Sequence, residues 1–309
     1  MKFKIFSILT ATLALPFLAA AQPYAYVANS ASRKVSIVDR NTNTMTGTIV
    51  LAAAATGLDV TPSGAYLYTA AGNSVAVVNL STNAVKATIA LPGVSQNVTV
   101  SPNGLFAYVT LPAIGKVGII DTTTNKLVTT LAAGDHPWLV AFNPTSTRAY
   151  VAAMYSGTVF MIDTATKTVT GSFASGGGAC ALAVSLDGTT VYVGNAYAST
   201  LTVHSDTGTL LATLPVTKPT SIALSPTGDR LYATSNSKAT VSVFDTATLN
   251  LLNNIPVGTA PTWVAVSSTR AYVANQNDFT MSIADTVNEV VLSTLTGVGA
   301  YPVAIALGK

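Results

Sequence analysis

Short hydrophobic runs recur along this chain at a nearly constant spacing. One run in each repeat carries a tyrosine, and the intervals between successive tyrosines are 42, 40, 42, 42, 40 and 40 residues. These tyrosines are Tyr26, Tyr68, Tyr108, Tyr150, Tyr192, Tyr232 and Tyr272. A second, Val-rich run in each repeat ends at Asp39, Asn79, Asp121, Asp163, Ser205, Asp245 and Asp285. A period of about 40 residues indicates seven copies of one supersecondary unit.

Each unit contains four short runs rich in Val, Ile, Thr and Tyr, which is the pattern of β-strands. In the third unit these runs cover residues 97–101, 105–110, 116–121 and 126–132. Ser101-Pro102-Asn103-Gly104 joins the first two, and its Pro and Gly favour a tight reversal. Helical spacing of apolar residues is absent beyond the N-terminal segment, so the sequence predicts an all-β fold.

Four strands per repeat of this length predict a seven-bladed β-propeller with four-stranded antiparallel blades. The repeat pattern begins at residue 24 with a second strand and ends at residues 302–307 with a first strand. The strand missing at one end is therefore supplied at the other. We expect residues 302–307 to pair beside residues 24–28 and close the ring, because an open sheet edge would leave backbone groups unpaired.

The N-terminal segment differs from the repeats. Residues 1–21 contain Lys2 and Lys4, an apolar run and then Ala19-Ala20-Ala21, the pattern of a secretory signal peptide. Residues 22–309 are then one propeller domain, exported to the periplasm, the cell surface or the medium, with no further membrane-spanning stretch. The full chain has 15 basic and 12 acidic residues, and removal of the signal peptide takes away Lys2 and Lys4. The mature net charge is then 13 minus 12, or +1. A charge this small disfavours nucleic-acid binding.

Three repeats carry a Tyr-to-Asn signature: Tyr26-Val-Ala-Asn29, Tyr192-Val-Gly-Asn195 and Tyr272-Val-Ala-Asn275. With the following Val-rich strand and DT-rich turn, these motifs resemble the YVTN-type seven-bladed β-propeller repeat family, including lactonase-like and nitrous-oxide-reductase N-terminal propellers. The resemblance covers residues 24–307 and implies the same fold. Such propellers host enzymes, electron-transfer proteins and surface-binding proteins, so the resemblance leaves the function open.

Loops between blades, and loops between second and third strands, meet on one face around the channel of a propeller. We predict a ligand or partner site there, formed by His136, Trp138, Lys218, Trp263, Tyr301, Arg33, Tyr155, Tyr197, Asn275 and Asp59. Trp138 follows its proline by one residue and Trp263 by two, so strand alternation predicts that at most one of them faces the channel.

Asp59 is unusual within its repeat position. The other units have Thr or Ala there: Thr99, Ala141, Ala183, Ala223, Ala265 and Ala306. A carboxylate on an innermost strand is either a ligand or base in the channel, or a structural group bonded to backbone N–H groups.

The chain has one cysteine, Cys180, and two histidines, His136 and His204. These numbers exclude an intramolecular disulfide, Fe–S clusters and haem attachment through C-x-x-C-H, and they predict no metal site and no cofactor. His204 replaces an apolar residue in a third strand and is expected to be packed.

Two functions remain. The first is a non-catalytic scaffold that binds an envelope protein, a glycan or a small molecule on the loop face, as a monomer. The alternative is a lactonase-like hydrolase that uses His136, Lys218, Arg33 and Asp59 at the same channel mouth. The scarcity of acid–base groups favours the first function over an enzyme.

Overall fold

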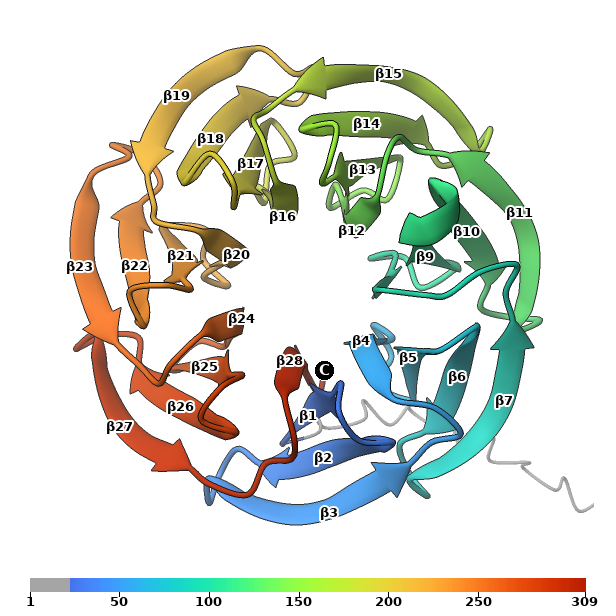
Figure 1. Cartoon of the computed structure of the whole chain (residues 1–309), viewed down its shortest axis with the longest axis horizontal. Coiled ribbons are helices and arrows are strands. Elements are labelled where there is room, and N and C mark those ends of the chain that lie inside the picture. Colours follow the sequence, from blue (N-terminus) through green and yellow to red (C-terminus); the bar gives the residue numbers. More distant parts are fainter. Residues whose placement is uncertain (1–22) are drawn as a thin grey trace, which may run out of the picture.

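The computed structural model describes residues 23–309, so the predicted signal peptide at residues 1–21 lies outside the described part. Seven four-stranded antiparallel sheets stand around a central channel (Figure 1). The predicted all-β, seven-bladed propeller is confirmed. One short 3-10 helix, η1 (Pro112–Ile114), interrupts the strands of the described chain.

The strands take four positions in the blades. The innermost strands are β4 (Ala55–Val60), β8 (Val98–Val100), β12 (Pro137–Phe142), β16 (Ala179–Val184), β20 (Pro219–Leu224), β24 (Pro261–Val266) and β28 (Pro302–Leu307). The second strands are β1 (Tyr24–Asn29), β5 (Tyr66–Ala71), β9 (Phe106–Leu111), β13 (Arg148–Ala153), β17 (Thr190–Asn195), β21 (Arg230–Ser235) and β25 (Arg270–Asn275). The third strands are β2 (Lys34–Asp39), β6 (Ser74–Asn79), β10 (Lys116–Asp121), β14 (Thr158–Asp163), β18 (Thr200–Ser205), β22 (Thr240–Asp245) and β26 (Thr280–Asp285). The outermost strands are β3 (Thr44–Val50), β7 (Ala84–Ala90), β11 (Lys126–Ala132), β15 (Thr168–Ala174), β19 (Leu210–Pro215), β23 (Leu251–Pro256) and β27 (Val290–Leu295).

The ring closes by pairing of the two ends of the repeat region. β28 is antiparallel to β1, with Ala25 opposite Leu307 and Ala28 opposite Ala304. Figure 1 shows this mixed blade, in which the C-terminal strand completes a sheet begun by β1, β2 and β3. The predicted closure is confirmed, and it removes the open edge that β1 would otherwise present.

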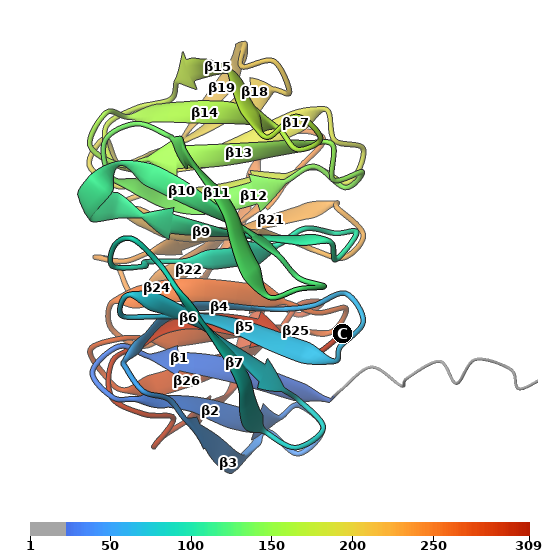
Figure 2. The same cartoon turned by 90° about the vertical axis from the view of Figure 1, so that its right-hand side faces the viewer.

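The two ends of the channel carry different connections between strands. The loop face carries the connections between blades and between second and third strands, and Figure 1 looks onto it. The turn face carries the remaining reversals, and Figure 2 places the C-terminus on that side. Aspartates at the ends of third strands cap the turns there, as Asp121 does by accepting bonds from the backbone N–H groups of Thr123 and Thr124. The Thr123 hydroxyl also donates to this carboxyl, and that bond, together with the two backbone bonds, lowers the pKa of Asp121.

Two of the repeated tyrosines form hydrogen bonds to the neighbouring blade. Tyr68 is fully buried, and its hydroxyl donates to Asn125 Oδ1 of the next blade at 2.6 Å. Tyr150 likewise donates to the carbonyl of Asp206 at 2.9 Å. Burial raises the pKa of Tyr68 to about 12, so the hydroxyl stays protonated and remains a donor.

Strands covered on both faces need apolar residues almost throughout, which accounts for the charged fraction of only 9%.

The asparagine of the Tyr-to-Asn signature has a structural role. Asn275 is fully buried, and its Nδ2 donates to Thr280 Oγ1 and to Ser282 Oγ at 3.0 and 2.9 Å. Asn29 and Asn195 make the corresponding bonds to Ser36 and Thr202. Asn275, which was predicted to belong to the loop-face site, is fully buried at the end of β25, beneath the loop that enters its own blade.

Gly258 covers this asparagine, and we expect Gly258→Ala to destabilise the protein. An added Cβ would lie 2.6 Å from Asn275 Cγ, too close without movement of a packed side chain. Overpacking of this kind costs about 1–3 kcal/mol, measured as a lower free energy of unfolding in urea. Gly177→Ala is the matched control, since its Cβ would meet Tyr197 Cβ at an ordinary 3.8 Å. Equal unfolding midpoints for the two variants would contradict the packing described here.

Candidate functional site

A cavity of about 380 Å³ opens at the centre of the loop face. Each of the seven blades contributes the residue three positions before the repeat position that Asp59 occupies in its own blade. These residues are Thr56, Gln96, Trp138, Cys180, Thr220, Thr262 and Val303. We call this cavity the upper chamber. Because one repeat position supplies the whole ring, the seven copies of the unit build one composite wall.

Both tryptophans line the upper chamber, so the prediction that at most one faces the channel is wrong. The reason is a register shift at the start of the innermost strands. β12 pairs Pro137 with Ala153 and then Leu139 with Ala152, and β24 shifts in the same way between Pro261 and Trp263. A bulge of this kind leaves one residue outside the alternation, so neighbouring positions can face the same space.

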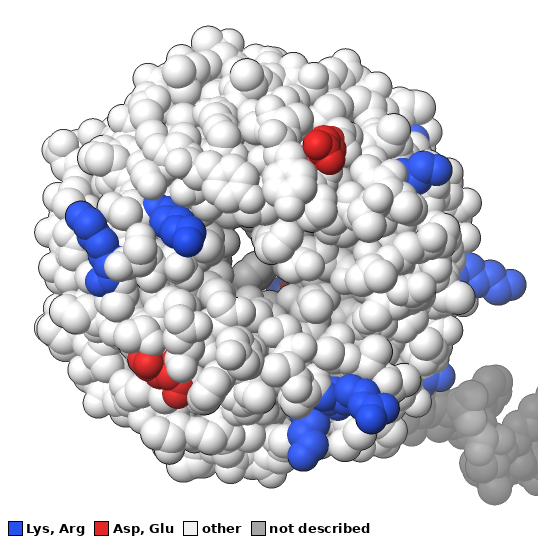
Figure 3. Space-filling view, viewed as in Figure 1, with Lys and Arg blue, Asp and Glu red and all other residues white. Residues whose placement is uncertain are grey.

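Loops between second and third strands form the outer wall of the upper chamber. They contribute Ser30, Met154, Ala196, Tyr197, Asn236 and Gln276. Lys218 is the one charged side chain among the described residues that line the chamber. Cys180 also lines it, and burial raises the pKa of this thiol to about 12, so it stays neutral. Figure 3 shows the same face, largely free of charged groups around the central hollow.

An aromatic stack extends from the chamber across the loop face. The His136 ring stacks on Tyr155 with centroids 4.2 Å apart, and it also lies nearly parallel to Trp138, with centroids 6.3 Å apart. His136 adopts a left-handed backbone with φ of 60°, and Lys218 and Tyr301 do the same before their prolines. Such backbone costs energy for a residue with a side chain, so the fold holds these three side chains in fixed directions.

Two other predicted residues lie on the loop face outside the upper chamber. Arg33 is exposed on the loop between β1 and β2, and its carbonyl accepts the Leu51 N–H. Tyr301 packs edge-to-face against Phe279, with ring centroids 5.0 Å apart. The structure therefore gathers Trp138, Trp263, Lys218 and Tyr197 in one cavity, with His136 and Tyr155 beside it.

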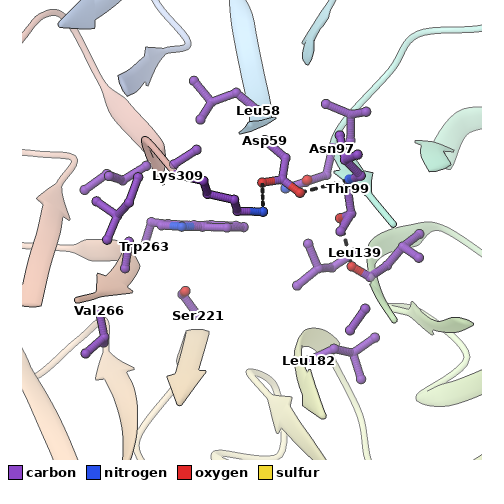
Figure 4. Close-up of a pocket in the computed structure, with 18 of the residues that line it drawn as sticks. Leu58, Asp59, Asn97, Thr99, Leu139, Leu182, Ser221, Trp263, Val266 and Lys309 are labelled. Carbon is purple, nitrogen blue, oxygen red and sulfur yellow. Dashed lines mark hydrogen bonds and ion pairs between the residues drawn. The ribbon is translucent and has the colours of Figure 1, made fainter. Parts of the chain in front are cut away.

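A second cavity, the lower chamber, occupies the channel below Trp263 and has a volume of about 730 Å³. Trp263 and Asn97 line both chambers. Pro102, Pro226 and Ser267, from the turn face, also line the lower one, so it opens on that side. The indole of Trp263 packs against three separate hydrophobic clusters around the ring, and Figure 4 shows it reaching across the channel.

Asp59 lies in the lower chamber, not at the mouth where it was predicted. Its two carboxylate oxygens accept the N–H groups of Val60 at 2.8 Å and Val100 at 2.9 Å. Lys309 Nζ lies 4.0 Å from Oδ1 (Figure 4). Burial raises the pKa of Asp59, while Lys309 and the two backbone bonds act in the opposite direction. The backbone bonds are those expected of a structural carboxylate. The exposure of Asp59 to the channel is that expected of a ligand-binding group or a base.

Several lining residues were missed at the level of sequence. Gln96, Asn97 and Thr220 belong to the wall of the upper chamber, and Lys309 faces Asp59 in the lower one. When the seven repeats are aligned, the position three residues before Asp59 and its equivalents forms the ring of the upper chamber. Every blade contributes this position, so the alignment could have identified it. Lys309 lies beyond the last repeat, where no such column exists.

The fold is shared with proteins of several kinds. The structure superposes on Kuenenia stuttgartiensis hydrazine synthase with a TM-score of 0.78 and 19% identity, covering 91% of this chain and 99% of that one. A functionally unknown protein from Desulfotomaculum acetoxidans gives 0.81 and 16%, with coverage of 92% and 98%. The dihydro-heme d1 dehydrogenase NirN in complex with DHE gives 0.69 and 19%, and this chain spans 65% of its length. At such identities the likeness shows the propeller fold alone.

No protein-family model matches this sequence, and neither does any curated protein. Across residues 23–309, no three His, Cys, Asp or Glu side chains form a group that could hold a metal ion. In the same part of the chain, no helix is long and apolar enough to cross a membrane.

Proposed function

We propose that this protein is an exported, non-catalytic propeller of the YVTN type that binds a partner molecule in the upper chamber. The observation that carries this proposal is the composite wall, in which seven blades contribute to one cavity at the centre of the loop face. Aromatic surfaces and a few directed polar groups in a concave site are typical of ligand recognition. Export rests on the pattern of residues 1–21, and the YVTN type on the three Tyr-to-Asn motifs.

The wall chemistry indicates the class of ligand. Its hydrogen-bonding groups are neutral amides and hydroxyls, such as Gln96, Asn236 and Thr220, and its one charge is the Lys218 ammonium. Trp138 and Tyr197 offer aromatic surface, and Tyr197 is 60% exposed before anything binds. A neutral or weakly anionic ligand with a ring face and several hydroxyl or amide groups complements this wall. A glycan segment of an envelope polymer has these properties.

The lactonase-like alternative gains no support from the geometry. It needs a base and a cation on the same reacting group. Lys218 lines the upper chamber and Asp59 the lower one, with Trp263 between them, while Arg33 lines neither. His136 is within stacking distance of Tyr155 and Trp138, so its surroundings are those of an aromatic contact surface.

The binding proposal predicts loss of ligand from variants of the upper chamber. A glycan array and a panel of envelope oligosaccharides, probed with the mature protein, should yield a ligand whose affinity falls at least about tenfold in Trp138→Ala and in Tyr197→Ala, because each removes a stacking surface. Lys218→Met should weaken anionic ligands more than neutral ones. Isothermal titration calorimetry measures each affinity.

Phe279→Ala serves as the matched control. Phe279 is exposed on the same face and contacts Tyr301, but it is outside the wall of the upper chamber. Its binding should equal that of the wild type. A ligand that binds all four variants with equal affinity, or a lactone that the wild type hydrolyses and His136→Ala does not, would overturn the proposal.

A further inference from the structure

The lower chamber has a ring of aliphatic side chains, one carboxylate, the cationic side chains of Arg40 and Lys309, and a few polar groups such as Thr99 and Ser221. One aliphatic side chain from each of six blades faces it: Leu58, Val98, Val140, Leu182, Ile222 and Ile305. The Trp263 indole borders it on the side of the loop face, where it also lines the upper chamber. Its volume of about 730 Å³ is within the range of small-molecule sites.

Asp59 is not required by the blade architecture. The six other blades place Thr or Ala at the same repeat position, and their innermost strands form without a carboxylate. Val60 and Val100 donate one backbone bond to each oxygen, which leaves further acceptor capacity on both oxygens toward the chamber. An ionised carboxylate in such surroundings is stable only with a cation or additional donors beside it.

Lys309 supplies that cation only loosely. Its Nζ is 4.0 Å from Asp59 Oδ1, beyond hydrogen-bond distance, and its side chain is 46% exposed while that of Asp59 is 23% exposed. Arg40 also lines the chamber, and its Nη2 donates to the Gly308 carbonyl at 3.2 Å, so the guanidinium is directed at the end of β28. A flexible, half-exposed lysine can move outward at small cost, since ion pairs of this exposure contribute little to stability.

We propose that the lower chamber is a second binding site, specific for a small organic amine with an apolar body. The ammonium group replaces Lys309 on Asp59 and donates charge-assisted hydrogen bonds to the oxygens that face the chamber. The apolar body contacts the aliphatic ring and the Trp263 indole. A carboxylic acid of the same size is excluded, because its charge would face Asp59. This site is independent of the proposed function, because the two chambers lie on opposite sides of Trp263.

The test uses the Trp138→Phe variant, in which Trp263 is the one remaining tryptophan of the chain. Its fluorescence then reports on the chambers that the indole borders. Hexylamine, hexan-1-ol and hexanoate share one apolar body and differ in their charge at pH 7. We expect hexylamine to bind at least about tenfold more tightly than hexan-1-ol, and hexanoate more weakly than either. Calorimetry provides a second measurement of each affinity.

Three substitutions in the Trp138→Phe background locate the amine. Asp59→Asn keeps the shape and should make hexylamine and hexan-1-ol equal. Lys309→Met should strengthen hexylamine binding severalfold, because the competing cation is gone. Lys218→Met is the control and should leave the hexylamine affinity unchanged, since Lys218 lines the upper chamber and not the lower one. Acidification should weaken hexylamine binding as Asp59 becomes protonated, and the loss should begin above the usual carboxyl range because burial raises the pKa of Asp59.

Several outcomes overturn the proposal. Hexylamine affinity that is unchanged in Asp59→Asn, or weakened in Lys309→Met, would show that Asp59 does not receive the ammonium group. Preference for hexanoate, lost in Lys309→Met, would assign the chamber to anions instead. Absence of any binding in the wild type and in Lys309→Met would show that the chamber is not an amine site. Thermal melting of each variant verifies that the ring is intact.

Discussion

Removal of residues 301–309 is expected to open the ring and to lower the melting temperature by at least about 10 °C, or to prevent folding altogether. The deletion removes β28, whose residues Ala304, Ile305 and Ala306 are buried against both neighbouring blades. It also leaves the hydrogen-bonding edge of β1 without a partner. Loss of one strand from a closed ring affects two blade interfaces, so the cost exceeds that of an ordinary terminal truncation.

Circular dichroism melting and size-exclusion chromatography measure this effect. Deletion of Lys309 alone is the control, because it leaves the pairing of β28 with β1 intact and should change the melting temperature by little. Exposed edge strands associate with one another, so the longer deletion should also elute as aggregates. A melting temperature equal to that of the wild type would show that β28 does not hold the ring closed.

The fold could be predicted from sequence because seven copies of one unit provide independent readings of the same pattern. The incomplete first repeat and the additional strand at residues 302–307 even specified how the ring closes. Hydrophobic alternation also placed the third-blade strands close to their observed bounds, with β10 (Lys116–Asp121) and β11 (Lys126–Ala132) as expected. Repetition makes local errors small, since one misread repeat is corrected by the other six.

The site was predicted less well, and the failures have physical causes. Alternation of side chains assumes a regular strand, but the register shift before Leu139 and at Trp263 brings both tryptophans to one cavity. Depth along the channel is also absent from the sequence pattern: Asp59 is on an innermost strand as expected, but three residues further from the loop face than the ring of the upper chamber. Asn275 is polar and belongs to a loop-proximal motif, but it is buried between its neighbouring strands and Gly258.

Trp263 and Asn97 lie where the two chambers of the channel meet. The upper chamber has amides, hydroxyls and aromatic edges, whereas the lower one has aliphatic walls and the Asp59 carboxylate. Trp263 borders both, and its indole contacts the cluster of Leu58, the cluster of Ile305 and the cluster that contains Leu139. One aromatic group thus borders two environments that would select different ligands.

Trp263→Ala is therefore expected to have two effects. The first is a decrease of about 3 kcal/mol in the free energy of unfolding, the lower end for a large aromatic residue, because the indole is only partly buried. Urea denaturation measures this decrease, and Trp138→Ala, whose side chain contacts one cluster instead of three, should cost less.

The second effect of Trp263→Ala is a wider connection between the upper and the lower chamber. Hexylamine should then lose affinity, because water entering from the loop face solvates Asp59 and the apolar body loses the indole. Trp263→Phe keeps an aromatic partition and should preserve most of the stability and of the amine affinity. A Trp263→Ala variant that binds hexylamine as tightly as the wild type would show that the partition does not form part of the amine site.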